Sequence, residues 1–183
     1  FCSLIKSINQ LFDLAHDYLL REIEFSWMKF FWNFQESKVP SSWHLKVYYK
    51  NLNSIEAESG SYVFSSKNLE TTKLKLNANS GSQIDIKMKT KNIEAKVFAG
   101  ATMKLDGKSD TGTLIANAGG AIDAKNLDFI TVDATVNAGG KIDVKATETV
   151  NATTRAGGSV NIYGNPKTVV EKTTAGGNIN RVK

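Results

Sequence analysis

The chain has 183 residues and a mild basic excess, with 23 lysine and arginine residues against 18 aspartate and glutamate residues. Its length predicts one domain. Lysine and aspartate are interspersed and arginine is scarce, so we expect no nucleic-acid partner, because that function favours basic blocks rich in arginine. The single cysteine, Cys2, excludes an internal disulfide and a cysteine-based metal cluster.

Residues 1–40 have a composition of their own. They hold six of the nine phenylalanines and two of the three tryptophans, and they contain no glycine. Apolar residues recur at close to helical spacing from Ile5 to Ile23, which predicts one or two helices before Pro40. We interpret this helical, aromatic-rich segment as a cap on the domain that follows. Two alternatives stay open: a helix that binds a membrane surface or a partner, and foreign sequence joined to the domain.

The start of the chain carries no recognisable targeting signal. The first residue is Phe1, and neither a signal peptide nor a lipobox before Cys2 can be recognised. No run of about eighteen uncharged apolar residues is present, so no membrane span is predicted. We expect a trimmed piece whose export signal is missing. Membrane contact would then require residues 1–40 or a missing lipid anchor.

A repeat of about nineteen residues runs from residue 55 to the end of the chain. A small residue followed by glycine recurs seven times, at glycine spacings of 21, 19, 19, 20, 18 and 19 residues. Glycine suits a sharp corner, where the chain needs a positive φ angle or leaves no room for a side chain. We therefore predict a corner at each pair. The pairs are Ser59-Gly60, Ser80-Gly81, Ala99-Gly100, Ala118-Gly119, Ala138-Gly139, Ala156-Gly157 and Ala175-Gly176.

Apolar and polar residues alternate on both sides of each corner. The residue three positions after each glycine is apolar and the next is mostly polar, as in a strand with one buried face. Similar apolar columns stand three, five and seven residues before the glycine, so each repeat has two strand segments. Because like residues occupy the same column in every repeat, we predict parallel stacking rather than an antiparallel meander. The first column is Val63, Ile84, Met103, Ile122, Ile142, Val160 and Ile179.

These patterns predict an all-β fold for residues 41–183, a right-handed parallel β-helix of about six to seven coils, with an N-terminal helical segment before it. In the last coil, Glu171, Asn180 and Arg181 interrupt the inward columns. Charged and polar groups at that place are what a solvent-facing cap requires.

We predict that two sets of polar residues outside the core have structural roles. We predict that Asn79, Asn117 and Asn137, which stand just before their corners, form a hydrogen-bonded ladder. On one outer face, aspartate and lysine are expected to neutralise one another, with Lys104 between Asp85 and Asp123. The pairs on this face are Asp85/Lys87, Lys104/Asp106, Asp123/Lys125 and Asp143/Lys145.

Several segments, taken in order, resemble a known family. They are Leu45-Lys46-Val47-Tyr48, the stretch 54–61, the recurrent Ala-Gly-Gly corners, Tyr163-Gly164-Asn165-Pro166-Lys167 and the closing stretch 176–180. Over about residues 44–183 the chain is similar to the auto-transporter adhesin, head GIN domain family. The resemblance implies a right-handed β-helix in exported or surface proteins, mainly of Bacteroidetes-like bacteria. Family members usually have further strands where residues 1–40 here are predicted to be helical.

No catalytic, cofactor-binding or metal-binding residues are predicted, and the two histidines, His16 and His44, lie outside the repeats. We therefore predict a non-enzymatic protein of the periplasm, outer membrane or extracellular space, with an adhesive or envelope-structural role. Its expected partner is a surface glycan or an envelope component. The alternatives are a carbohydrate-binding module and a polysaccharide-active enzyme, for which Asp123 and Asp143 would be the carboxylates to test.

Overall fold

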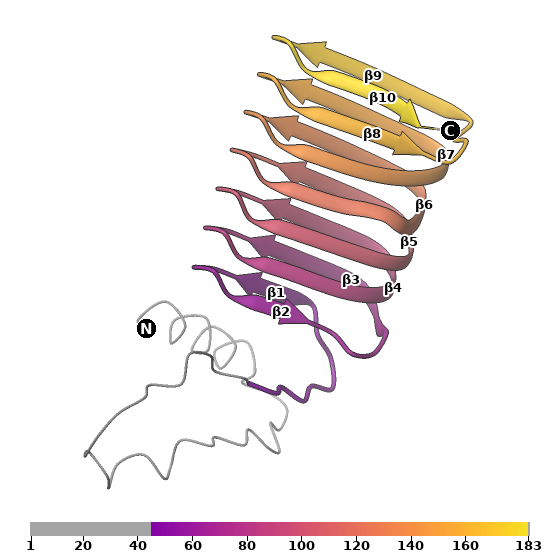
Figure 1. The fold of residues 1–183 in the computed structure, drawn as a ribbon. Helices are drawn as coiled ribbons and strands as arrows, with labels where there is room; N and C mark the ends of the chain where they lie inside the picture. The colour runs from indigo at the N-terminus through magenta and orange to yellow at the C-terminus, as the bar shows by residue number, and fades with distance from the viewer. Residues whose placement is uncertain (1–44, 183) are drawn as a thin grey trace, which may run out of the picture.

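The structure is a computed structural model that describes residues 45–182, where all regular structure is β-strand (Figure 1). The predicted helical segment, residues 1–40, lies outside the described residues, and no helix occurs within residues 45–182. The strands are β1 (Ser54–Ala57), β2 (Tyr62–Phe64), β3 (Leu69–Ala78), β4 (Gln83–Val97), β5 (Thr102–Ala116), β6 (Ala121–Asn137), β7 (Lys141–Arg155), β8 (Ser159–Tyr163), β9 (Thr168–Thr174) and β10 (Asn178–Val182).

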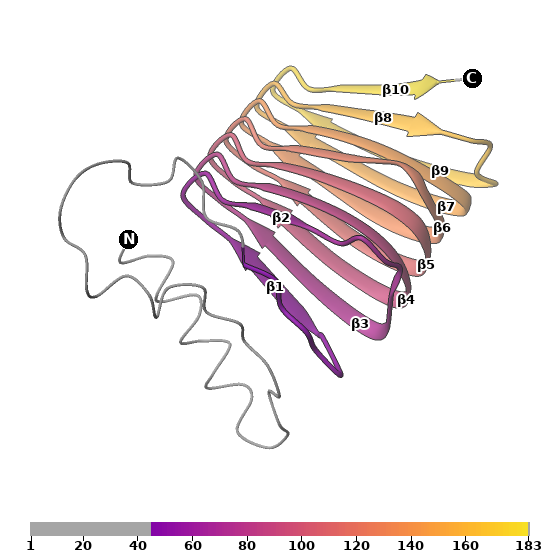
Figure 2. The ribbon, with the colours of Figure 1, turned by 60° about the horizontal axis from the view of Figure 1, so that its bottom comes forward.

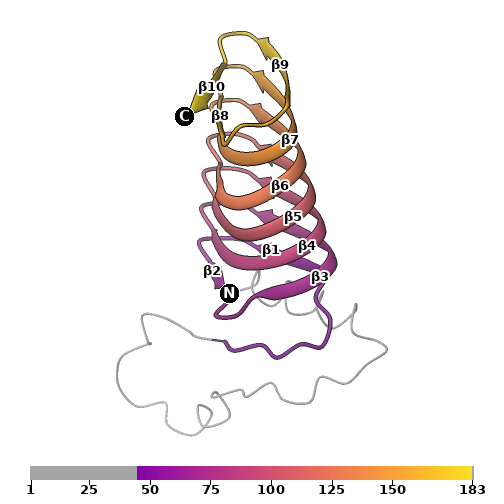
Figure 3. The ribbon, with the colours of Figure 1, turned by 90° about the vertical axis from the view of Figure 1, so that its right-hand side faces the viewer.

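The chain winds in stacked laps that form a parallel β-solenoid. The main path of the sheet runs β1-β3-β4-β5-β6-β7-β8-β10, while β2 pairs with β4 and β9 pairs with β7. Every one of these pairings is parallel. Seven corners separate the laps, which agrees with the predicted six to seven coils. Figures 1 and 3 show the laps rising from β1 and β2 to β9 and β10.

Each lap has two sides. Strands β4 to β7 run along one side, bend, and return along the other (Figures 1 and 3). We call the side made by β2, β8, β10 and the first halves of β4–β7 the front side. The back side is made by β1, β3, β9 and the second halves of β4–β7. Figure 2 separates the two, with β2, β8 and β10 above β1, β3 and β9.

The core lies between the two sides and has the predicted register. Ile84 pairs with Met103, Met103 with Ile122, and Ile122 with Ile142. All four side chains are buried, with at most 2% of their surface exposed. Burial of each such side chain contributes about 1.5–3 kcal/mol, so repetition of these columns drives the stacking. Other large side chains of this core are Leu74, Leu76, Ile86, Met88, Leu105, Leu114, Leu127 and Phe129.

The predicted corners are tight turns with two successive residues at positive φ. In the corner at Ala118-Gly119, φ is 47° at alanine and 74° at glycine, and the amide of Gly120 donates to the carbonyl of Asn117 at 2.9 Å. Positive φ at both central residues is the signature of a type I′ turn. Successive corners are also bonded to each other, since the amide of Gly100 donates to the carbonyl of Ala118 at 3.2 Å.

Ala118→Asn should stabilise the protein by about 0.5–1 kcal/mol. Alanine is strained at positive φ, asparagine tolerates this region, and Asn-Gly is a preferred type I′ pair. Urea unfolding of the two proteins measures the difference. Ala121→Asn, the same change inside a strand, is the control and should not stabilise. A lower unfolding free energy for Ala118→Asn would show that the corner is not under strain.

The residue after each corner glycine faces a narrow part of the core, which explains the second glycine of Ala-Gly-Gly. A Cβ atom on Gly158 would lie 2.1 Å from Cγ1 of Val136. One on Gly140 would lie 2.8 Å from the carbonyl oxygen of Ala116. The equivalent Ser82 is fully buried, and its hydroxyl donates to the carbonyl of Ala57 at 2.8 Å. Only very small side chains therefore fit in this column.

Differences in lap length are absorbed at the bend opposite the corners. The register between β5 and β6 shifts between Lys104 and Asp106, and that between β6 and β7 shifts between Ala124 and Asp128 and again after Phe129. On both sides of this region the columns return to register. The lap from Gly119 to Gly139 has 20 residues where its neighbours have 19 and 18, so the extra residues bulge outward there.

Glu171 and Arg181 close the described end of the core, as predicted. They occupy inward columns on opposite sides of the last lap, where Glu171 pairs with Ala152 and Arg181 pairs with Ile162. Nε and Nη2 of Arg181 donate to one carboxylate oxygen of Glu171 at 3.0 and 2.8 Å. The prediction for Asn180 was wrong, because Asn180 pairs with Asn161 in an outward column and donates to its Oδ1 at 3.0 Å.

Candidate binding face

The outer face of the front side carries alternating charged residues, and their predicted pairing is partly confirmed. Lys104 lies between Asp85 and Asp123 in register, and its Nζ is 3.6 Å from Oδ2 of Asp85. Lys125 is 3.1 Å from Asp123 of its own strand. The outward column that contains Asp85, Lys104 and Asp123 is therefore neutralised by short-range ion pairs, as expected.

The second charged column is not continuous. Lys87 is the register neighbour of Asp106, but the two form no ion pair, and Oδ1 of Asp106 is buried without a hydrogen-bond partner. On its other side Asp106 faces Asn126 instead of Lys125, because β6 bulges at this point. Lys145 instead forms an ion pair with Asp128 at 2.9 Å. The bulge thus moves this column away from the regular face and toward the bend.

Asp143 is the most enclosed carboxylate of the face, with 7% of its surface exposed. Its Oδ2 lies 2.9 Å from Nζ of Lys141, and its Oδ1 accepts a hydrogen bond from Nδ2 of Asn161 at 2.6 Å. The bond to Asp143 raises the pKa of Lys141, and the bond to Asp123 raises the pKa of Lys125. The two lysines offset the like charges of Asp123 and Asp143, which are adjacent in register.

A shallow groove of about 410 Å³ follows this face across five laps. Its middle is low because Thr102 and Ala121 are small, while Tyr62 and Lys141 stand at its two ends. Two outward columns line it: Tyr62, Gln83, Thr102, Ala121 and Lys141 in one, and Asp85, Lys104, Asp123 and Asp143 in the other.

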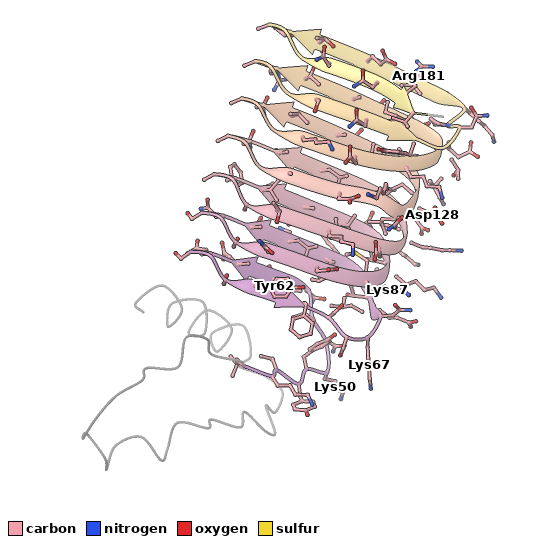
Figure 4. The ribbon with its side chains drawn as sticks, in the orientation of Figure 1. Lys50, Tyr62, Lys67, Lys87, Asp128 and Arg181 are labelled. Atoms are coloured by element: carbon pink, nitrogen blue, oxygen red, sulfur yellow. The ribbon has the colours of Figure 1, made fainter. Side chains whose placement is uncertain are left out.

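Two aromatic rings stand at the β2 end of the groove. Tyr62 and Phe64 have ring centroids 5.6 Å apart at an interplanar angle of 21°. They are 58% and 62% exposed, and Figure 4 shows Tyr62 on the outside of β2. Sequence reasoning missed this pair, although both residues stand at outward positions of the repeat on either side of Val63. Large aromatic residues at solvent-facing positions were the available signal.

The predicted asparagine ladder forms only in part. Nδ2 of Asn137 donates to Oδ1 of Asn117 at 2.7 Å, but Asn79 does not reach them, because Phe98 occupies the equivalent place in the lap between. Oδ1 of Asn79 instead accepts from the amide of Ser80 at 2.9 Å. These contacts tie neighbouring corners to each other.

Residues 45–182 offer neither a metal site of clustered side chains nor a membrane-spanning helix. No group of three or more histidine, cysteine, aspartate or glutamate side chains there is arranged to hold a metal ion. The same part of the chain contains no helix with the length and apolar character needed to cross a membrane.

Parallel laps, an apolar interior and polar outer faces define residues 45–182 as a β-solenoid. The chain belongs to the family described as "Putative auto-transporter adhesin, head GIN domain", whose profile matches residues 22–166. This range begins before, and ends before, the range of about residues 44–183 over which the sequence motifs resemble the family. No curated protein matches the chain.

A solved structure supports the same assignment. The crystal structure of a putative adhesin from Bacteroides fragilis has a TM-score of 0.68 to this chain at 25% sequence identity. The similarity covers 72% of this chain and 61% of that protein. The chain therefore corresponds to about three fifths of the length of this neighbour.

Proposed function

We propose that this chain is a non-enzymatic adhesive module of the bacterial cell surface or envelope, located in the periplasm, the outer membrane or outside the cell. Membership of an adhesin family and similarity to a putative adhesin support an adhesive role. The observation that carries the proposal is the long outer face, which offers a broad contact surface along several laps. Its partner would be a surface glycan or an envelope component.

The charge pattern of the front side supports the non-enzymatic part of the proposal. Asp85, Asp123 and Asp143 each lie within ion-pair distance of a lysine on the same face. Glycoside cleavage by two carboxyl groups needs one of them kept protonated, usually by an apolar pocket. A polysaccharide-active enzyme is the alternative, and a carbohydrate-binding module is favoured over it by the exposed Tyr62–Phe64 pair.

The solenoid is proposed to be right-handed, as most parallel crossovers are. The support lies in the direction of the strands: in Figure 1, β2, β8 and β10 run to the right in front as the stack rises, while β1 and β9 run to the left behind. A crystal structure of the full chain would test the hand directly.

Beads coated with the full chain should attach to immobilised bacterial envelope polysaccharide or to mucin more than beads coated with albumin. The same polysaccharides, incubated with the protein, should release no reducing ends. Equal attachment of both bead types would contradict the adhesive role. Turnover that disappears in Asp123→Asn or Asp143→Asn would replace the proposal with the enzymatic alternative.

A further inference from the structure

Tyr62 and Phe64 form a stacked aromatic pair on the outer surface. Both rings lie on a solvent-facing sheet position and leave more than half of their surface exposed, at 58% and 62%. Exposed aromatic pairs oppose solubility and commonly mark binding surfaces. The two rings are fixed by β2, which pairs with β4 through Gln83 and Asp85. The two rings are stacked on each other, and Tyr62 is the ring of the pair that lines the end of the groove.

The groove that starts at Tyr62 is elongated, and this shape favours a long ligand. It runs from Tyr62 to Lys141, over side chains contributed by β2, β4, β5, β6 and β7. Adjacent laps lie about 4.8 Å apart, so equivalent side chains recur along the groove at short, regular intervals. Its volume of about 410 Å³ is within the range of small-molecule sites. A chain of several small rings fits this shape better than a single compact ligand.

The charges of the groove favour an uncharged ligand. Each carboxylate in it has a lysine partner, at 3.6 Å for Asp85, 3.1 Å for Asp123 and 2.9 Å for Asp143. A charged ligand would have to break one of these pairs. Gln83 and Thr102 are exposed and have no side-chain hydrogen bond among the described residues, so they are available to bind hydroxyl groups.

We infer that the groove binds a neutral oligosaccharide chain that lies along the solenoid axis. This inference rests on the proposed adhesive function and names the ligand class of its surface. One pyranose ring stacks its C–H face on the exposed face of Tyr62, which Phe64 supports by stacking, because the negative face of an aromatic ring attracts positive C–H groups. Gln83 and Thr102 hydrogen-bond the hydroxyl groups of the next rings, and the ion-paired carboxylates accept further bonds from hydroxyl groups.

The test uses isothermal titration of the full chain with neutral gluco-, manno-, galacto- and fuco-oligosaccharides of four to six rings. At least one should bind, and the Tyr62→Ala/Phe64→Ala double variant should weaken its affinity about tenfold or more. Gln83→Ala/Thr102→Val should weaken it several-fold. Phe98→Ala, which removes a 37% exposed aromatic ring near a corner, is the matched control and should bind normally. Thermal unfolding should be the same in all four proteins.

The salt dependence of binding distinguishes a neutral oligosaccharide ligand from an acidic polysaccharide. Affinity for the neutral chain should change little between 50 and 500 mM NaCl, because no net charge is neutralised on binding. No binding to any of the neutral oligosaccharides, or binding unaffected by the Tyr62→Ala/Phe64→Ala change, would overturn the inference. Tight, strongly salt-dependent binding of acidic polysaccharide alone would do so too. In each of these cases bead attachment, if retained, leaves the adhesive function standing, whereas loss of all attachment would remove that function itself.

Discussion

Phe129→Ala is expected to lower the free energy of unfolding by about 3–5 kcal/mol. Phe129 is 1% exposed, and its neighbours in the same column are the smaller Ser109 and Ala146. Its ring fills the space beside Gly112 in the adjacent lap, where a Cβ atom would lie 2.3 Å from Cε1 of the ring. Truncation would leave a cavity in a core that cannot collapse, because both laps are held by backbone pairing. Urea unfolding measures the loss.

The pairing of Phe129 with Gly112 also predicts coupling between two substitutions. Gly112→Ala alone should destabilise the protein, because the new methyl group clashes with the ring. In the Phe129→Ala background the same methyl group has room and should cost much less, so a double-mutant cycle should show a coupling energy above about 1 kcal/mol. Ile130→Ala, at the adjacent residue with 48% exposure, is the control and should change stability by about 0.5 kcal/mol or less. Additive effects would contradict this packing.

Gly107→Ala should be the most damaging of the glycine substitutions, at about 3 kcal/mol or more. Gly107 has φ of +117°, and a Cβ atom there would lie 1.9 Å from the carbonyl oxygen of Met88 in the adjacent lap. Both the backbone strain and the clash with a backbone atom oppose any side chain. The consequence should appear as a lower midpoint in urea unfolding, or as failure to accumulate folded protein.

Gly119→Ala separates the two causes. Gly119 also has positive φ, at +74°, but nothing lies within 4 Å of a Cβ atom added there. Only the backbone strain at positive φ opposes alanine here, so this change should lower the free energy of unfolding by about 1–2 kcal/mol. If Gly107→Ala and Gly119→Ala were equally destabilising, the close approach of Gly107 to Met88 would not be a real feature of the fold.

The register of the core could be predicted from the sequence because like residues repeat in every lap. Ile84, Met103 and Ile122 fall in one column whichever lap is taken as the start, and any slip of one residue would bury Asp85 or Lys104. The corners could also be predicted, because a small residue followed by glycine recurs once in every lap. The positive φ of Ala118 was not, because alanine carries no signal for that conformation and adopts it only where the turn is held by neighbouring laps.

The candidate face was harder to predict, since it depends on local irregularity. The extra residue that moves Lys125 away from Asp106 was visible as a 20-residue lap, but its position within β6 was not. The groove exists because Thr102 and Ala121 are small between Tyr62 and Lys141. Such differences in height appear only when the columns are placed side by side in space.

The direction of the backbone pairing between laps has a mechanical consequence for the adhesive role proposed above. In this stack every lap-to-lap pairing is parallel, and its hydrogen bonds point along the long axis. A pulling force between the two ends therefore acts on one lap boundary at a time, instead of shearing all of them together. Each lap of about nineteen residues that peels away adds about 60–70 Å of extended chain. Under tension the solenoid would lengthen in steps and keep its remaining laps attached.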